Sequence, residues 1–236
     1  MQKLLSHVRA AIQKYNMIEE GDRIAIGVSG GKDSVALLYS MAQLRHFYPV
    51  KFSIYAVTLD MGVGGKRNDF SEITELCRKL DVPYIIKNTE IGKIVFEERK
   101  ETNPCSLCAK MRRGVLHDTA KELGCNKIAL GHHLDDVVQT FYMNLFNEGR
   151  IGCFSPVTYL SRKDLYVIRP MIFAFERDVV RAVKSASLPV VKSICPNDGI
   201  SERKHVKALV ASLEKEYKNL RIMTIGALQR ASVDGW

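Results

Sequence analysis

Residues 27–34 (Gly-Val-Ser-Gly-Gly-Lys-Asp-Ser) constrain this chain most strongly, because they join two stretches of different periodicity. The apolar run at residues 23–28 predicts a buried strand, and the pattern at residues 34–43 predicts a helix. Glycines between a strand and a helix let backbone amides approach an anion, and the helix N-terminus adds partial positive charge. The segment therefore predicts a phosphate-binding loop, with an ordinary glycine turn as the alternative.

The loop departs from the Walker A motif. Only three residues separate Gly27 from Gly31, where Walker A has four, and Asp33 follows Lys32. Residues 29–34 instead resemble the PP-loop of the ATP pyrophosphatases. That resemblance implies binding of ATP and transfer of AMP to a substrate oxygen.

The remaining apolar patterns alternate between strand and helix. Strands are predicted at residues 51–59, 82–87 and 126–130, with a short edge strand at 166–169, and the stretch 149–161 is irregular. Helices are predicted at residues 1–16, 70–80, 134–146, 176–187, 200–217 and 220–229, with a loop at 188–199. This order predicts an α/β fold with a doubly wound, mostly parallel sheet. We predict an ATP-binding domain over residues 1–170, with an inserted cysteine-bearing helix. A helical extension over residues 171–236 packs on the same core.

Ligands of such sheets collect at the carboxyl ends of the strands, where three segments should meet. The expected ATP-binding residues are Ser29, Gly30, Gly31, Lys32, Asp33, Ser34, Leu59, Asp60, Gly131, His133 and Asp135. The expected catalytic residues are Lys32, Asp33, Arg112 and Asp136. Asp33 either caps the helix or holds Mg²⁺. Of the adjacent Asp135 and Asp136, one can cap a helix while the other holds Mg²⁺ or orients the attacking oxygen.

Six cysteines without a secretory signal argue against a disulfide framework. Cys105 and Cys108 form a CxxC pair at the start of a predicted helix, and Cys195 lies in a loop. A CxxC pair admits three interpretations: a redox pair, half of a zinc site, or cluster ligands. Three thiolates would leave one metal position open. The remaining cysteines, at positions 77, 125 and 153, are interpreted as buried apolar residues.

Most of the net charge of +9 lies after residue 100. A basic surface beside an ATP site suits a polyanion such as RNA, and the alternative is an ordinary solvated surface. Candidate RNA contacts are Arg150, Arg162, Lys163, Arg177, Arg181, Lys184, Arg203, Lys204 and Lys207, and Arg112 is a candidate for ATP or RNA. No apolar run reaches the roughly 18 residues of a membrane span, so we expect a cytoplasmic protein without a membrane partner.

Several segments in a fixed order resemble the tRNA 2-thiocytidine synthetase family of the PP-loop superfamily. They are residues 15–21, the PP-loop, residues 104–108 with 111–114, residues 127–136, residues 168–170 and the loop carrying Cys195. The resemblance implies a [4Fe-4S] cluster held by Cys105, Cys108 and Cys195, whose open iron binds sulfide. It implies that a tRNA base oxygen attacks Mg-ATP and that sulfur then replaces the adenylated oxygen. It further implies tRNA as partner, a sulfur donor such as a cysteine desulfurase or free sulfide, and a homodimer as a hypothesis.

Two departures leave the target base open: residues 190–194 lack a cysteine that many family members carry, and the region after Asp60 is short. The chain lacks the terminal zinc ribbons of related 2-thiouridine enzymes, which favours cytidine. One rival is thiolation of uridine or another sulfur transfer on a nucleobase. A rival from another class is a metal-bearing RNA-binding module with an inactive ATP site. Zinc on three cysteines and water is an alternative to the cluster.

Overall fold

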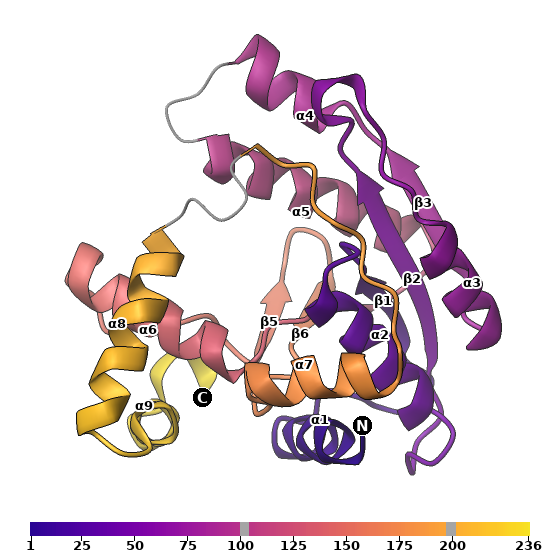
Figure 1. The fold of residues 1–236 in the computed structure, drawn as a ribbon. Helices are drawn as coiled ribbons and strands as arrows, with labels where there is room; N and C mark the ends of the chain where they lie inside the picture. The colour runs from indigo at the N-terminus through magenta and orange to yellow at the C-terminus, as the bar shows by residue number, and fades with distance from the viewer. Residues whose placement is uncertain (100–103, 197–201) are drawn as a thin grey trace.

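Strands and helices alternate along most of the chain (Figure 1). The computed structural model describes residues 1–99, 104–196 and 202–236. The strands are β1 (Arg23–Gly27), β2 (Ser53–Asp60), β3 (Tyr84–Asn88), β4 (Lys127–Ala129), β5 (Val157–Leu160) and β6 (Leu165–Ile168). The helices are α1 (Gln2–Lys14), α2 (Lys32–Leu44), α3 (Ser71–Lys79), α4 (Ile91–Lys93), α5 (Pro104–Glu122), α6 (Leu134–Glu148), α7 (Glu176–Ser185), α8 (Glu202–Glu216) and α9 (Leu220–Arg230), with shorter helical turns at Val63–Gly65, Ile94–Glu98 and Val233–Gly235.

The described strands form one sheet in the order β3-β2-β1-β4-β6-β5. All neighbouring pairs are parallel except β5 and β6. From β1 the chain builds β2 and β3 on one side and then adds β4 and β6 on the other, so the strand order reverses beside β1. Such a reversal opens a crevice at the carboxyl ends of the strands. The predicted doubly wound, mostly parallel sheet is confirmed.

The predicted position of the edge strand is wrong. Residues 166–169 were expected at the edge, but β6 pairs with β4 on one side and β5 on the other. β5 forms the edge, inside a stretch that the sequence predicts to be irregular. A tight turn through Asp164, which has φ of 48°, returns the chain antiparallel from Leu160 to Leu165. β5 is not apparent from the sequence because none of its residues is fully buried. A strand of this kind does not require a regular alternation of apolar and polar residues.

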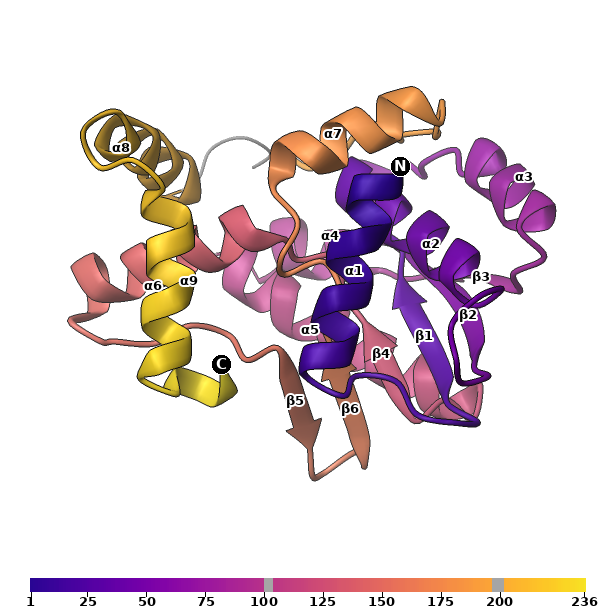
Figure 2. The same cartoon turned by 90° about the horizontal axis from the view of Figure 1, so that it is seen from below.

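Alternate residues of the central strand serve opposite faces of the sheet. Ile24 and Ile26 belong to one hydrophobic cluster, and Ala25 between them belongs to another. This is the two-residue period of a strand buried on both faces. The first cluster includes α1, α2 and α7, whereas α5 supplies Leu116 and Ala120 to the second (Figure 2).

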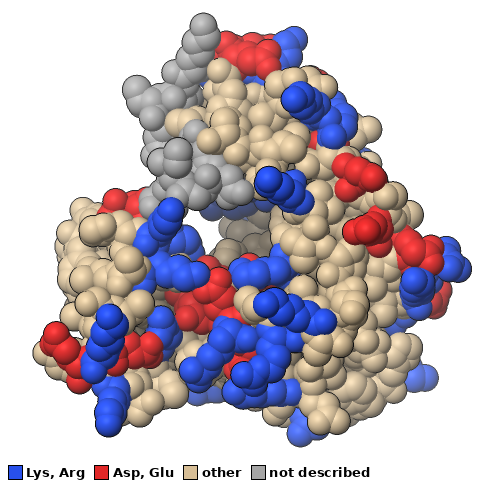
Figure 3. Space-filling model, viewed as in Figure 1, with Lys and Arg blue, Asp and Glu red and all other residues tan. Residues whose placement is uncertain are grey.

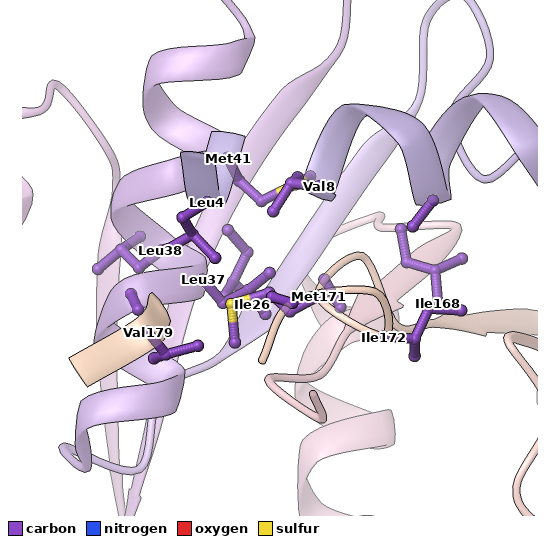
Figure 4. Close-up of a cluster of buried hydrophobic side chains, with 14 of the residues drawn as sticks. Leu4, Val8, Ile26, Leu37, Leu38, Met41, Ile168, Met171, Ile172 and Val179 are labelled. Carbon is purple, nitrogen blue, oxygen red and sulfur yellow. The ribbon is translucent and has the colours of Figure 1, made fainter. Parts of the chain in front are cut away.

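The larger cluster unites segments that lie far apart in the chain (Figure 4). Leu4 and Val8 of α1, which the sequence places on one face of an amphipathic helix, are buried against α2. The other labelled members are Ile26, Leu37, Leu38, Met41, Ile168, Met171, Ile172 and Val179. This packing fixes α2, whose N-terminus adjoins the phosphate-binding loop, against the sheet.

The C-terminal helices pack in two places. α7 contacts α1 and α2, whereas α8 and α9 contact α6 (Figure 1). The predicted loop residues 197–199 and the predicted helix start at residue 200 lie outside the described residues. The proposed domain boundary at residue 170 stays a prediction.

Candidate active site

Hydroxyl groups of the turn between β1 and α2 form hydrogen bonds to the backbone of the same turn. The Ser34 hydroxyl donates to the Gly31 carbonyl over 2.9 Å and accepts from the Ser29 amide over 3.1 Å. Gly30 has φ of 87°, which favours glycine. Among the described residues, no side chain caps the first turn of α2, so the capping role expected for Asp33 is wrong. The first amides of α2 have no acceptor within the helix and are therefore available to an anion, whereas the Ser29 and Gly31 amides donate to hydroxyl groups of the turn.

The turn after β4 closes on the phosphate-binding loop, as predicted. A Cβ atom at Gly131 would lie 3.0 Å from the Asp33 carbonyl oxygen, so only glycine allows this approach. His133 caps α6: its amide donates to Asp136 Oδ2 over 3.0 Å, and its Nδ1 accepts from the Asp136 amide. His133 Nε2 lies 3.6 Å from Asp33 Oδ1. The two predicted segments thus share one crevice.

A chain of ion pairs crosses this crevice. Lys32 Nζ lies 2.9 Å from Asp33 Oδ2 and 3.2 Å from Glu176 Oε1. The second oxygen of Glu176 pairs with Lys207 of α8, and Arg203 of α8 pairs with Asp136 over 3.0 Å. Asp33 Oδ1 is buried and accepts no hydrogen bond from the described residues. That orphaned carboxylate oxygen suits a divalent cation.

The ion pairs shift the titration of both central groups. Burial disfavours the Lys32 ammonium, but the neighbouring carboxylates of Asp33 and Glu176 outweigh it and raise the pKa of Lys32. Burial likewise opposes ionisation of Glu176, but Lys207 and Lys32 outweigh it and lower the pKa of Glu176 to about 2. Both groups are therefore charged at neutral pH.

These shifts predict an acid-dependent loss of stability. The folded-state pKa of Glu176 lies below its ordinary value of 4.5, so its contribution is complete above that value and is lost as pH falls from about 4.5 through about 2. We expect Glu176→Gln to reduce the fall in the free energy of unfolding between pH 5 and pH 3, measured by urea titration. Glu72→Gln, on the exposed face of α3, is the control. Parallel pH curves for the wild type and the Glu176 variant would contradict the assignment.

The adjacent carboxylates of α6 have different surroundings. Asp135 accepts the Glu176 amide over 2.7 Å and pairs with Arg221 Nε over 2.9 Å, so it fastens the start of α7 to α6 and α9. Asp136 caps α6 and faces Arg203. The ATP-binding role of Asp135 and the catalytic role of Asp136 stay predictions.

The end of β2 adjoins both the phosphate-binding loop and the cysteines. The Val28 amide donates to the Val57 carbonyl over 2.8 Å, which ties the strand to the loop. The Asp60 carboxylate is buried and accepts from the Gly62 amide at 3.3 Å. The next side chain, Met61, places Sδ 3.6 Å from Cys108 Sγ. The ATP contacts expected of Leu59 and Asp60 stay predictions.

Of the three predicted ligand cysteines, Cys105 and Cys195 each interact with Cys108. Cys105 is exposed and Cys108 is buried in the first turns of α5, and Cys195 is half-buried in the loop between α7 and α8. Burial raises the pKa of the Cys108 thiol, Arg112 opposes the rise, and the thiolates of Cys195 and Cys105 add to it. Such interactions require proximity. Within the described part of the chain, no three His, Cys, Asp or Glu side chains are placed to surround a single metal ion.

The remaining cysteines lie in the hydrophobic core. Burial raises the pKa of Cys77 and Cys153 to about 12 and that of Cys125 to about 11. Thiols with such pKa values are poor nucleophiles at neutral pH. Their surroundings agree with the structural role expected from the sequence.

Lys and Arg side chains surround a hollow in which acidic side chains are visible (Figure 3). The ion pairs of Lys207 and Arg203 place α8 at this site. Sequence reasoning placed both residues only among candidate RNA contacts and did not identify Glu176 or Arg221. Charged residues at helix ends resemble solvated surface in a sequence, so no local signal marks them.

No helix in the described residues is both long and apolar enough to cross a membrane.

Comparisons with known proteins place the chain in a family. The family model described as the PP-loop domain matches residues 4–194. A tRNA-cytidine(32) 2-sulfurtransferase from Syntrophotalea carbinolica is 41% identical over 221 residues, 92% of this chain and 85% of that protein. A protein of the same name from Geobacter sulfurreducens is 38% identical over 229 residues, 96% of this chain and 88% of that protein.

Two solved structures are also similar to this chain. The U34-tRNA thiolase NcsA from Methanococcus maripaludis, solved with its [4Fe-4S] cluster, matches with a TM-score of 0.79 at 26% identity, over 96% of this chain and 77% of that one. An NH3-dependent NAD synthetase from Campylobacter jejuni, at 17% identity and a TM-score of 0.52, shares only the fold. The chain belongs to the PP-loop domain family and, within it, to the family of the tRNA-cytidine(32) 2-sulfurtransferases.

Proposed function

We propose that this protein is an ATP-dependent tRNA sulfurtransferase that replaces the C2 oxygen of a cytidine with sulfur. The observation that carries the proposal is that the phosphate-binding loop and Cys108 both adjoin the carboxyl-terminal end of β2. Met61, which follows the end of β2, joins the two through its contact with Cys108. The cytidine 2-sulfurtransferases similar to this chain support the choice of reaction.

In the first half-reaction the chain positions ATP for attack by the base oxygen. The amides at the N-terminus of α2 hold the phosphates, and Lys32 neutralises charge as pyrophosphate leaves. Asp33 and Asp136 provide carboxylates for Mg²⁺, and the orphaned Oδ1 of Asp33 supports this role. Positioning and electrostatic stabilisation supply most of the rate enhancement in such sites.

In the second half-reaction the cysteines serve the sulfur donor site. Cys105, Cys108 and Cys195 would hold a [4Fe-4S] cluster, because cysteine thiolates are the ligands of such clusters; the usual set is four, so three would leave one iron open. When bound, the cluster supplies the sulfur that replaces the adenylated oxygen. Arg112 lies one helical turn after Cys108 and places positive charge beside these thiolates.

The proposal extends to the partners of the enzyme and to its location in the cell. The basic side chains around the hollow in Figure 3 would bind tRNA phosphates. Arg203 and Lys207, which pair with Asp136 and Glu176, are candidates for these contacts. A cysteine desulfurase or free sulfide would renew the sulfur, and the enzyme would work in the cytoplasm, where its tRNA substrate is modified. We also propose that the enzyme forms a homodimer. Each chain would consist of an ATP-binding domain, residues 1–170, and a helical extension, residues 171–236.

Uridine is the second candidate base. The structure of NcsA, a U34-tRNA thiolase, matches this chain over 96% of its length, and the shared site chemistry does not by itself select the base. The cytidine enzymes are more similar in sequence, which favours cytidine.

The test is mass spectrometry of tRNA nucleosides from cells with and without the gene. We expect 2-thiocytidine to disappear in the deletion strain and to return when the gene is restored. Unchanged 2-thiocytidine with lost 2-thiouridine would transfer the proposal to uridine. Tight tRNA binding without tRNA-dependent pyrophosphate release would instead favour an RNA-binding module with an inactive ATP site.

Anaerobic purification followed by iron, sulfide and zinc analysis tests the metal. Iron and sulfide in equal amounts would support the cluster. A zinc-loaded, iron-free protein that still thiolates tRNA would exclude it.

A further inference from the structure

The segment that carries Cys195 crosses the phosphate-binding loop. We call residues 188–196, which follow α7 and include Cys195, the Cys195 strap. Figure 1 shows the strap running from the end of α7 past the start of α2 toward α5. Its Val191 amide donates a hydrogen bond to the Gly30 carbonyl over 3.0 Å. The third predicted cluster ligand is thus tied to the loop that is proposed to hold the ATP phosphates.

Gly30 is closely packed on two sides, by Val191 of the strap and by Phe70 at the start of α3. A Cβ atom at Gly30 would lie 2.9 Å from Val191 Cβ and 3.4 Å from the ring of Phe70, so the loop backbone is enclosed between the strap and α3. Val190 is 48% exposed, whereas Val191 turns inward. The buried Gly30 backbone is therefore packed against the half-buried Val191, so a shift of the strap would press on the phosphate-binding loop.

We infer that Val191 is a positioning residue that couples nucleotide binding to occupancy of the cysteine site. The inference rests on the proposed function. A cluster on Cys195 restrains the strap, and the strap then holds Gly30 and its neighbouring amides in the arrangement that receives phosphate. By reciprocity, a bound nucleotide restrains the strap and tightens binding of the cluster by the same factor.

The coupling is measured in the unmodified protein. Anaerobic calorimetry compares the Kd of a non-hydrolysable ATP analogue with cluster-loaded and cluster-free protein. We expect binding to be about fivefold or more tighter in the loaded form, the lower end of typical coupling between sites. At equilibrium with a competing chelator, the ratio of cluster-bound to chelated iron should rise by a similar factor when the analogue is present. Equal Kd values in the two forms would overturn the inference without any substitution.

Val191→Pro removes the donor, because proline has no backbone N–H. The ratio of the two Kd values should then approach 1, while Val191→Ala, which keeps the amide, should retain most of the ratio. A ratio that is unchanged in Val191→Pro would show that this hydrogen bond carries no coupling. If Val191→Pro does not fold, as judged by circular dichroism, the wild-type comparison still decides.

The same experiment separates the two proposals. A protein that thiolates tRNA but takes up neither iron nor sulfide overturns the cluster assignment and the coupling that rests on it, whereas a protein that does not thiolate tRNA overturns the proposed function. A protein that loads a cluster and thiolates tRNA, but binds the analogue equally well in both forms, overturns only the coupling.

Discussion

Cys108→Ala is expected to abolish tRNA thiolation. Cys108 is the buried member of the three cysteines and contacts Met61, the residue after β2, so its thiol has a fixed place beside the end of that strand. Loss of an outer-shell partner alone costs metal sites about 10- to 100-fold in affinity or activity, and loss of a direct ligand should exceed that. Thiolated nucleoside formed by the anaerobically reconstituted enzyme is the measurement.

Cys77→Ala is the matched control. Cys77 is a buried cysteine in α3, so the same substitution removes the same atom away from the site. We expect Cys77→Ala to keep its iron and sulfide and its thiolation activity, whereas Cys108→Ala should lose both. Cys108→Ala that retained full thiolation would refute the ligand assignment.

The second large effect is expected for Lys32→Met. Lys32 is the first residue of α2, and its ammonium is drawn into the crevice by Asp33 and Glu176. Removing it deletes a preorganised positive group where charge develops on the departing pyrophosphate. Loss of a single such group typically lowers kcat by about 100- to 1000-fold. Pyrophosphate release at saturating ATP and tRNA measures the effect.

Lys79→Met removes an exposed lysine of α3 and should leave the rate of pyrophosphate release unchanged. The cluster content of both variants should equal that of the wild type, which separates a defect in adenylation from a defect in the cysteine site. A Lys32→Met variant with a rate near wild type would remove Lys32 from the catalytic residues.

The strands and helices that form the nucleotide half of the molecule could be predicted because their signals are local. β1, the glycine turn and α2 follow one another within about twenty residues, and the two-residue period of Ile24 and Ile26 survives in the folded sheet. β6 was misplaced at the edge because its neighbour, β5, is held by backbone pairing with little apolar burial. Pairing of that kind leaves little trace in side-chain pattern.

Some contacts of the candidate site could also be predicted from the sequence, and others could not. The meeting of Gly131 with the phosphate-binding loop followed from the rule that parallel strands end at one edge. The partnership of Lys32 with Glu176, and of Asp136 with Arg203, did not follow from any rule, because each pair joins helices far apart in the chain. Their long side chains could equally have reached solvent.

The sequence by itself determined the strand, glycine turn and helix of the phosphate-binding loop, and the CxxC pair that opens α5. These features depend on backbone freedom and spacing within a few residues, which a sequence states directly. Only the tertiary structure decided that Asp135 fastens α7 while Asp136 faces Arg203, and that Val191 carries the Cys195 strap across Gly30. Those outcomes depend on which helices pack together, and packing is settled by the whole core rather than by the residues that make the contact.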